Sequence, residues 1–388
     1  MSTRASLACA SALVALALGC TGRARTPTDV PAGPPPVDPR FAAVPPPQLP
    51  IKVSGDRRHL VDQADRPFLL HGDAGWSIVS TADREGAERY LEDRRARGVN
   101  AVTIVLIDHI EPPGNAYGDA PFRTRGDFGT PNEAYFRHAD WIVRRAGEKG
   151  MVVLLSPCYL GDQGGPEGFY QDVVRNGAAT MREWGRFVGQ RYRSFDNVVW
   201  LDGGDYNPPP EGIALLTAVV EGIRSADDRH IHAVHWSSET SGREIGVPWL
   251  DLNTTYTYQP VYLKTLPDHA DATRPFILLE AHYENEHDST TQRLRSQAYY
   301  AMLSGASGHV FGSYPVWKFA SGWPEHLDTR GARSMTHLRS LLTGRAWYDL
   351  APDASNRILV AGQGAFGGTE YALLASRRSL PIAPSEDA

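Results

Sequence analysis

The sequence predicts an α/β protein whose main domain is a (β/α)8 TIM barrel, and three observations lead to this fold. After Pro50, short apolar or β-branched runs alternate with amphipathic segments, as in parallel sheets covered by helices. Eight such runs occur in roughly 290 residues, whereas the alternative, an open doubly wound sheet, rarely has so many units. Chemically active side chains follow most of the runs, as expected where βα loops build an active site.

The predicted strands are short apolar runs, and most of the segments between them have helical periodicity. The strands are Phe68–Leu70, Val99–Ile107, Met151–Ser156, Val198–Leu201, Ile231–His235, Leu252–Tyr258, Phe276–Glu280 and His309–Tyr314. The helices are Thr81–Arg97, Asn132–Lys149, Thr180–Tyr192, Glu211–Ser225 and Thr290–Leu303. The first helix is expected to begin at Ser80 and to end at Gly98. No convincing helix is found between the sixth and seventh strands.

The N-terminus has the pattern of an exported, lipid-anchored protein. The apolar run Ala5–Leu18 follows Arg4 and has the length of a signal-peptide core. It ends in Ala17-Leu18-Gly19-Cys20, which resembles a bacterial lipobox; an ordinary secretory signal is the alternative. Ten prolines between Pro27 and Pro50 favour an extended tether without helix or sheet. We therefore expect a signal peptide over 1–19, a lipidated Cys20 with a tether over 20–50, and export to the cell envelope or secretion.

Charge and cysteine content narrow the possible functions. Thirty-nine Lys and Arg against forty-five Asp and Glu give a net charge of -6, so nucleic acid is not an expected partner. Of the three cysteines, Cys9 and Cys20 lie in the leader, so Cys158 has no partner for an internal disulfide. The membrane is expected as a partner only through the lipid anchor.

Two carboxylates at strand ends are the candidate catalytic pair. The strand Val198–Leu201 runs into Asp202-Gly203-Gly204-Asp205, where two glycines permit a sharp turn that projects Asp205 into the barrel mouth. The strand Phe276–Glu280 ends on a carboxylate, and period-two alternation places Phe276, Leu278 and Glu280 on one face. Strands four and seven lie nearly across a barrel from each other. Their acids can therefore flank a sugar and cleave its glycosidic bond.

Aromatic side chains concentrate after the same strands and suit the apolar faces of sugar rings. They are Trp76, Tyr159, Tyr206, Trp236, Tyr258, Tyr283 and Trp317.

Four ordered motifs resemble the apiosidase-like glycoside hydrolase family. They are Leu70-His71-Gly72-Asp73-Ala74-Gly75-Trp76, Tyr90-Leu91-Glu92-Asp93-Arg94, Leu201-Asp202-Gly203-Gly204-Asp205-Tyr206-Asn207-Pro208 and Glu280-Ala281-His282-Tyr283-Glu284. Members of this family have a (β/α)8 barrel, often followed by a small β domain labelled as collagen-binding. The resemblance implies a barrel over 51–350, a glycan substrate, and a retaining two-carboxylate mechanism without a cofactor.

The resemblance also implies roles for individual residues. Asp205 matches the acid of the Gly-Gly-Asp motif and is expected to be the general acid, and Glu280 is expected to be the nucleophile, with Glu284 as second choice. The predicted substrate-binding residues are Asp73, Trp76, His109, Tyr206, His235, Tyr258, Tyr283, Glu284 and Trp317. After the barrel, 351–388 is too short for a full β domain and is expected to be a truncated β hairpin.

Other readings of the sequence are weaker. The clusters His282 to Asp288 and His230 to His235 lack the spacing of a metal-binding helix motif, so no metal is expected. Gly362-Gln363-Gly364-Ala365-Phe366-Gly367 matches a dinucleotide-binding pattern but precedes another strand-like run rather than a helix. The alternative function is a non-catalytic glycan- or matrix-binding lipoprotein that retains the barrel. A pure binder has no need for acids at both Asp205 and Glu280, which favours the enzyme.

Overall fold

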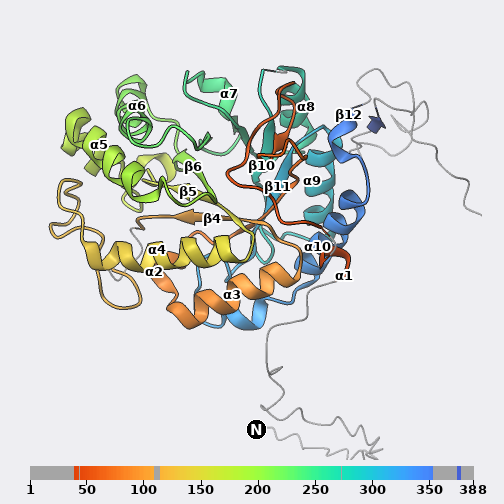
Figure 1. Cartoon of the computed structure of the whole chain (residues 1–388), viewed down its shortest axis with the longest axis horizontal. Coiled ribbons are helices and arrows are strands. Elements are labelled where there is room, and N and C mark those ends of the chain that lie inside the picture. The colour runs from red at the N-terminus through yellow and green to blue at the C-terminus, as the bar shows by residue number, and fades with distance from the viewer. Residues whose placement is uncertain (1–38, 43, 109–113, 272, 353–373, 377–388) are drawn as a thin grey trace, which may run out of the picture. The chain divides into compact units, whose positions relative to one another are not determined.

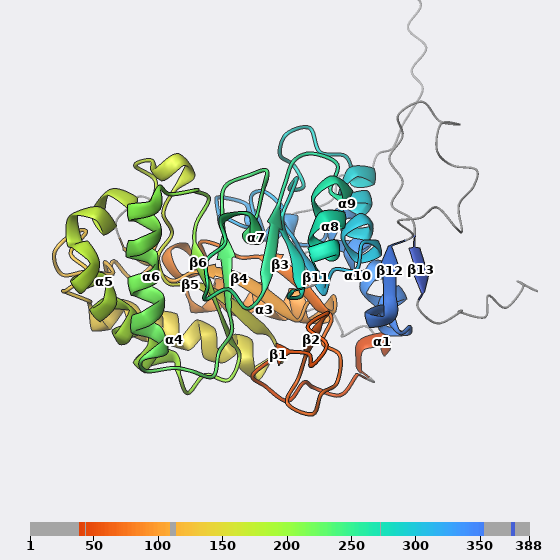
Figure 2. The ribbon, with the colours of Figure 1, turned by 90° about the horizontal axis from the view of Figure 1, so that it is seen from above.

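The predicted barrel is present in the computed structural model, which describes residues 39–42, 44–108, 114–271, 273–352 and 374–376. Its main sheet has the strand order β7-β6-β5-β4-β3-β11-β10-β9-β8. Neighbours from β7 through β9 are parallel, and the short β8 is antiparallel to β9. A parallel bridge between Ala233 and Leu252 joins the β7 and β9 edges, so eight parallel strands close into a barrel (Figures 1 and 2).

All eight predicted strands occur, with boundaries that differ by a few residues. In chain order the strands of the main sheet are β3 (Leu70–Ala74), β4 (Ala101–Val105), β5 (Val152–Ser156), β6 (Val198–Gly203), β7 (His232–His235), β8 (Thr240–Ser241), β9 (Asn253–Tyr256), β10 (Phe276–Glu280) and β11 (Gly308–Phe311).

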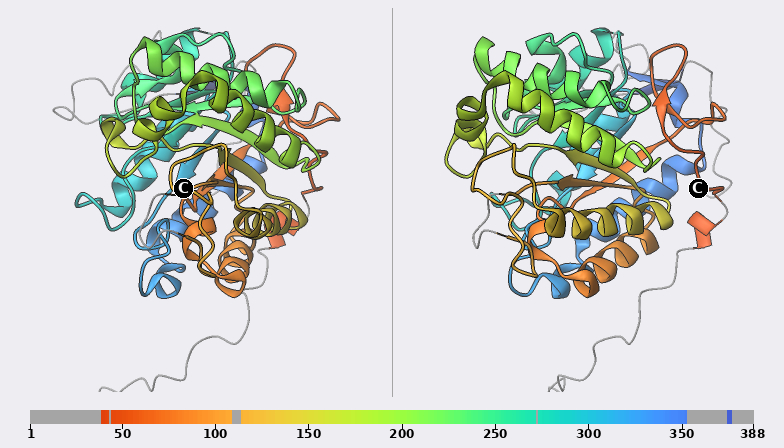
Figure 3. Two further views of the ribbon diagram at one scale, coloured as in Figure 1. Left: turned by 90° about the vertical axis from the view of Figure 1, so that its left-hand side faces the viewer. Right: turned by 60° about the vertical axis from the view of Figure 1, so that its left-hand side comes forward.

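Helices surround the strands, and Figure 3 shows this outer layer from two further sides. In chain order they are α2 (Ile78–Thr81), α3 (Arg84–Ala96), α4 (Glu133–Glu148), α5 (Tyr170–Tyr192), α6 (Pro210–Arg224), α7 (Gly242–Ile245), α8 (Tyr262–Asp271), α9 (Thr291–Leu303) and α10 (Arg330–Thr343). Short 3-10 turns cover Asp162–Gly164, Trp323–His326 and Trp347–Asp349.

The helices differ from the prediction in several places. The cap of α3 is Asp83, which accepts from the Gly86 N–H, rather than Ser80. Helix α5 begins ten residues early and continues through Gly177, whose φ of 70° is not helical. Helix α8 was not expected, and it contains Pro267, a residue that normally opposes a helix. It is held instead by the buried Asp268, which accepts hydrogen bonds from Ser241 and Thr255. Helix α10 was not predicted either.

Alternate residues of each strand pack into two separate layers. Inside the barrel lie small and branched side chains such as Leu70, Val152, Leu201 and Ile277, with little or no exposed surface. The other face of each strand packs against the helices, forming one cluster with α2 to α6 and another with α9 and α10. This period of two decides which strand-end residues face the barrel mouth.

The amino ends of the strands are closed by an N-terminal hairpin of β1 (Lys52–Val53) and β2 (Leu60–Val61). Ile51, Leu60 and Phe68 join the interior cluster there, and Leu49 packs against it. The preceding chain is hydrogen bonded to this hairpin region, because the Arg66 guanidinium donates to the Pro46 carbonyl at 2.9 Å. The chain thus enters the barrel at the end opposite the predicted site.

Only parts of the predicted tether and of the predicted C-terminal hairpin lie within the described residues. A single helical turn, α1 (Pro39–Ala42), lies within the stretch expected to be extended throughout. Strands β12 (Leu350–Pro352) and β13 (Leu374–Ser376) pair antiparallel, whereas the predicted hairpin residues around 357–373 lie outside the described part. The signal peptide, Cys20 and most of the tether lie outside it as well. Among the described helices, none has the length and apolar character needed to span a bilayer.

Candidate active site

A cavity of ≈ 320 Å³ opens at the carboxyl ends of the barrel strands. Its volume falls within the range of about 300 to 1,000 Å³ that is usual for small-molecule sites. It is lined by Trp76, Ser77, Val105, Asp108, Tyr159, Glu167, Asp205, His235, Tyr256, Tyr258, Glu280, Tyr283, Glu286, Trp317 and Lys318. The cavity therefore brings together both predicted catalytic acids and five of the predicted substrate-binding residues.

The turn after β6 places Asp205 in the cavity. Gly203, Gly204 and Asp205 have φ values of 88°, 141° and 51°, so three successive residues adopt conformations that L side chains rarely take. A Cβ added to Gly204 would lie 2.6 Å from the Tyr159 ring. The Gly204 N–H donates a hydrogen bond to the His235 carbonyl at 2.7 Å. The positive φ of Asp205 costs roughly 1 to 3 kcal/mol, a kind of strain that concentrates at functional sites.

A β-bulge turns Glu280 toward the cavity. Phe276 and Leu278 face the outer helices, whereas Ile277 and Leu279 lie inside the barrel. Regular alternation would place Glu280 outside as well, so the expectation that it shares a face with Phe276 and Leu278 is wrong. The register between β10 and β9 shifts between Leu278 and Glu280, and this irregularity re-aims the carboxylate.

His235, at the end of β7, connects the parts of the site. Its Nε2 lies 3.0 Å from Glu280 Oε2. The imidazole stacks on the Trp76 indole at 5.3 Å between ring centroids with 9° between the planes. The Trp76 indole N–H in turn donates to the Tyr283 hydroxyl at 2.8 Å. Side chains from β7 and from the loops after β3 and β10 therefore hold the Glu280 carboxylate in place.

The electrostatics of the cavity separate the two acids. Burial raises the pKa of Asp205 to about 7; the charge of His235 opposes this rise and that of Glu280 adds to it. Burial alone would lower the pKa of His235, but the hydrogen bond and charge of Glu280, together with the charge of Asp205, raise it. A buried Asp205 with a raised pKa thus faces Glu280, which is paired with a histidine whose pKa is also raised. This division suits one proton donor and one anionic nucleophile.

Tyr256, Glu167, Glu286 and Lys318 are among the lining residues that sequence reasoning did not single out. Tyr256 ends β9, two residues before the predicted Tyr258, and their hydroxyls lie 2.9 Å apart. Period-two alternation within the predicted strand could have identified it. Glu286 accepts from the Trp317 indole N–H at 2.7 Å. It lies in a loop, as do Glu167 and Lys318, and loops carry no periodic signal.

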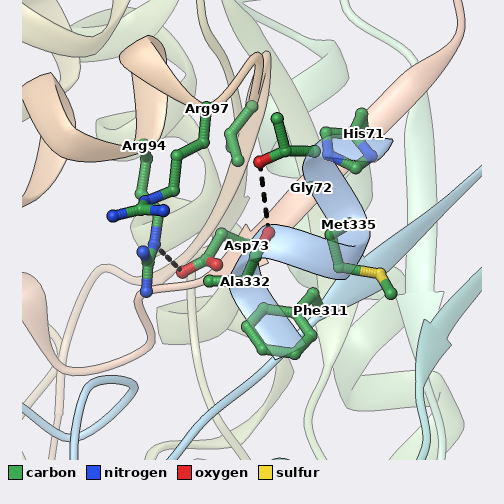
Figure 4. Close-up of a pocket in the computed structure, with 10 residues that line it drawn as sticks. His71, Gly72, Asp73, Arg94, Arg97, Phe311, Ala332 and Met335 are labelled. Carbon is green, nitrogen blue, oxygen red and sulfur yellow. Dashed lines mark hydrogen bonds and ion pairs between the residues drawn. The ribbon is translucent and has the colours of Figure 1, made fainter. Parts of the chain in front are cut away.

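Asp73 lies outside this cavity, and its predicted contact with substrate is corrected. Strand β3 continues to Ala74, so Asp73 falls within the strand and faces outward rather than following the strand into a loop. There it accepts from Tyr90 at 2.7 Å and pairs with Arg94 at 2.9 Å, with 3% of its surface exposed. Figure 4 shows this pair in a small space between the barrel and its outer helices.

Glu284 also lies away from the cavity, although the sequence left it as a possible nucleophile. Its carboxylate accepts from the Thr329 hydroxyl and, at 2.9 Å, from the Gly331 N–H at the start of α10. It therefore holds the N-terminus of a helix. Tyr206 packs on Tyr170 of α5, and Trp236 donates to the Gly242 carbonyl, so neither lines the cavity. His109 lies outside the described residues, and so does Cys20.

Two histidines of the His230 to His235 cluster have carboxylate partners. His230 pairs with Asp227 at 2.6 Å, and His232 pairs with Asp202 at 2.7 Å, all four buried outside the barrel interior. Within the described ranges, no group of three or more His, Cys, Asp or Glu side chains is placed to hold a metal ion. Cys158 is buried, and burial raises the pKa of its thiol.

Comparison with known proteins agrees with this geometry. Residues 54–349 match the family model described as "Apiosidase-like, catalytic domain". A solved structure titled "Glycoside hydrolase" superposes with a TM-score of 0.73 at 22% identity, covering 84% of this chain and 81% of that one. A glycoside hydrolase family 5 protein from Bacteroides vulgatus ATCC 8482 gives 0.72 at 20% identity, over 84% and 78%. An endo-1,4-beta-D-mannanase from Thermotoga petrophila RKU-1 gives 0.51 at 15% identity, over 71% and 100%. No curated protein sequence matches the chain.

Proposed function

The chain belongs to the apiosidase-like family of glycoside hydrolases, and from that premise we propose that it cleaves its substrate with retention of anomeric configuration. Asp205 serves as general acid and Glu280 as nucleophile. The observation that carries this proposal is the shared cavity, in which a buried acid with a raised pKa faces a carboxylate paired with His235.

The reaction proceeds in two steps that use only these side chains and water. Glu280 attacks the anomeric carbon while the bond to the leaving oxygen breaks and Asp205 transfers its proton to that oxygen. A water molecule then attacks the resulting glycosyl ester while Asp205 takes a proton from it. This step releases the sugar and restores the Glu280 carboxylate. His235, 3.0 Å from the Glu280 carboxyl group, keeps that group oriented toward the sugar.

The cavity favours an uncharged sugar at the cleavage site. Among the described lining residues, Asp108, Glu167, Asp205, Glu280 and Glu286 are acidic, whereas Lys318 and His235 are basic. A uronic acid or sulfated sugar would bring another negative charge among these acids, which is unfavourable in a partly buried site. The aromatic walls offer apolar surface to a neutral ring instead.

A screen of the purified barrel against neutral plant and microbial glycans tests the function, with released reducing sugar as the readout. Proton NMR during the first minutes of turnover then identifies the first-formed anomer. Release of a sugar with the anomeric configuration of the substrate supports retention, whereas the opposite anomer contradicts it. Binding without sugar release from any glycan would favour the non-catalytic alternative.

The pH dependence of kcat/KM should show a descending limb near pH 7. Burial raises the pKa of Asp205 to about 7, so the proton donor is present below that pH and is lost as the pH rises through it. The limb should have unit slope on substrates with a poor leaving group. His235 also titrates in the cavity, so the profile is repeated for the wild type on an activated aryl glycoside, whose leaving group needs no proton and for which an Asp205 limb should disappear. A limb that persists with this substrate would assign it to His235.

Export and surface anchoring form the remaining part of the proposal. The lipobox-like Ala17-Leu18-Gly19-Cys20 and the proline-rich segment behind it support a lipid anchor with a spacer. The chain before the barrel is attached at the amino ends of the strands, where Gln63 donates to the Pro50 carbonyl at 2.6 Å and the Gln48 N–H donates to Asp62. A tether leaving from this end would direct the cavity away from the membrane, toward extracellular glycan.

Lipidation at Cys20 is expected if the boundary functions as a lipobox. Labelled palmitate supplied to cells of a bacterial host should enter the wild-type protein and should not enter Cys20→Ser. A Cys9→Ser variant is the matched control and should label normally. Equal labelling of Cys20→Ser and wild type would contradict lipidation at Cys20.

A further inference from the structure

A second groove lies beside the catalytic cavity and has no assigned role. It has a volume of ≈ 450 Å³ and is formed by residues 258–261 after β9, by His282 after β10, and by one side of α9. Tyr258 lines both this side groove and the catalytic cavity. The two spaces are therefore neighbours that share Tyr258 as a wall residue.

The lining of the side groove has the chemistry of a carbohydrate site. Tyr258 and Tyr300 provide aromatic rings, and Gln259, Gln292 and Gln297 provide amide groups. Rings of this kind pack on the apolar faces of sugars, while amides can both donate to and accept from hydroxyl groups. Arg293, on the exposed side of α9, adds further donors to the rim.

The wall between the two spaces is fixed by a series of hydrogen bonds. The Tyr258 hydroxyl lies 2.9 Å from that of Tyr256, and burial raises the pKa of Tyr258 to about 12, so this hydroxyl keeps its proton. His282 Nε2 lies 3.1 Å from the Tyr258 carbonyl. Gln297 Nε2 donates to the His282 carbonyl at 2.7 Å. A shared wall held in this way loses little freedom when a ligand binds.

Two polar atoms of this wall have unused hydrogen-bonding capacity. Gln297 is 8% exposed, and its Oε1 has no hydrogen-bond partner among the described residues. Within the same part of the chain, His282 Nδ1 also has none. Buried polar atoms of this kind are uncommon and call for a partner. Both atoms are shielded from solvent in this wall, so a sugar hydroxyl reaches them only when the side chain turns toward the groove.

We infer that the side groove is a second sugar subsite, which binds the residue of the glycan adjacent to the one held in the catalytic cavity. The inference rests on the proposed function and makes it more specific. The substrate is then an oligosaccharide or polysaccharide segment of at least two sugars rather than a lone glycoside. The gain in affinity with chain length should come from this groove.

The test fills the groove without touching the catalytic residues. Ser296 lines the groove on α9, and Ser296→Trp places a large ring in it. Arg295→Trp adds the same ring to the same helix at an exposed position outside the groove, so it is the matched control. Thermal melting of both variants checks that the barrel is intact.

Binding is measured by calorimetry with mono- to tetrasaccharides of β-1,4-linked glucose, mannose and xylose. In wild type and Arg295→Trp, at least one tetrasaccharide should bind at least 10-fold more tightly than its monosaccharide, and this gain should be lost in Ser296→Trp. No gain with length in wild type, or the same gain in Ser296→Trp, would overturn the subsite.

Kinetics separate this inference from the proposed function. On the tetrasaccharide that the wild type cleaves, kcat/KM of Ser296→Trp should fall at least 10-fold, while hydrolysis of the aryl glycoside of one sugar stays unchanged. An equal fall on both substrates would contradict the subsite. If the wild type cleaves nothing, the proposed function fails, and the calorimetric comparison alone decides on the groove.

Discussion

Replacing Glu280 by Gln should lower kcat by about 10⁴-fold or more on every substrate, activated or not. Without the carboxylate no glycosyl ester can form, and the quality of the leaving group cannot compensate. The neutral amide keeps the size of the side chain, and it can still approach His235, which lies 3.0 Å from the native carboxylate. We therefore expect the variant to fold and to bind glycans while its initial rate of sugar release falls to near background.

The matched control is Glu284→Gln, which alters the other glutamate of the same motif. Because Glu284 holds the start of α10 through Thr329 and Gly331, this change should lower the melting temperature and leave kcat of the folded enzyme within a few fold of wild type. A large loss of kcat in Glu284→Gln, with Glu280→Gln still active, would transfer the nucleophile role to Glu284.

The parts of the fold that repeat in sequence were predictable. Eight apolar runs separated by helical segments predicted a barrel, and all eight strands are present. The turn that carries Asp205 was predictable for a different reason: two glycines before Asp205 permit positive φ values, and the structure has them at 88° and 141°. The backbone freedom of glycine and the period-two pattern of a strand both depend on residues close together in the chain, so both can be identified from the sequence.

The errors arise where the end of a strand, or a shift in its register, decides which way a side chain faces. Strand β3 extends to Ala74, which moves Asp73 from the predicted site to an outward face beside Arg94. The bulge in β10 has the opposite effect on Glu280. Regular alternation would place this side chain on the outer face of the strand, and the register shift turns it into the cavity. Neither extra pairing nor a bulge leaves a periodic signal, since both are decided by the neighbouring strands.

The choice between Glu280 and Glu284 depended on an element that the sequence did not reveal. The partners of Glu284 belong to the N-terminus of α10, about 45 residues further along the chain. Without that helix, the sequence favours Glu280 only because it ends its strand, and Glu284 follows four residues later in the same motif. Tertiary contacts of this range cannot be read from spacing within the motif, and they separate a structural carboxylate from a cavity carboxylate.

Replacing Asp205 by Asn should affect substrates unequally, because in the proposed mechanism the native residue supplies a proton in the first step and removes one in the second. A natural glycan, whose leaving oxygen needs protonation, should lose about 10³-fold or more in kcat/KM. A 2,4-dinitrophenyl glycoside needs no proton, so its glycosyl ester should still form and appear as a burst of phenolate. Steady-state turnover should then be slow, because the amide of the variant side chain cannot deprotonate the incoming water.

Azide distinguishes this role from mere structural damage at the strained turn. It is an anionic nucleophile that needs no general base, so it should accelerate turnover of the aryl glycoside by Asp205→Asn and yield a glycosyl azide of retained configuration. Wild type and Glu280→Gln should show no such acceleration, since the first already has its base and the second forms no ester. If Asp205→Asn is as inactive as Glu280→Gln on the activated substrate and azide changes nothing, Asp205 is not the acid and base of this site.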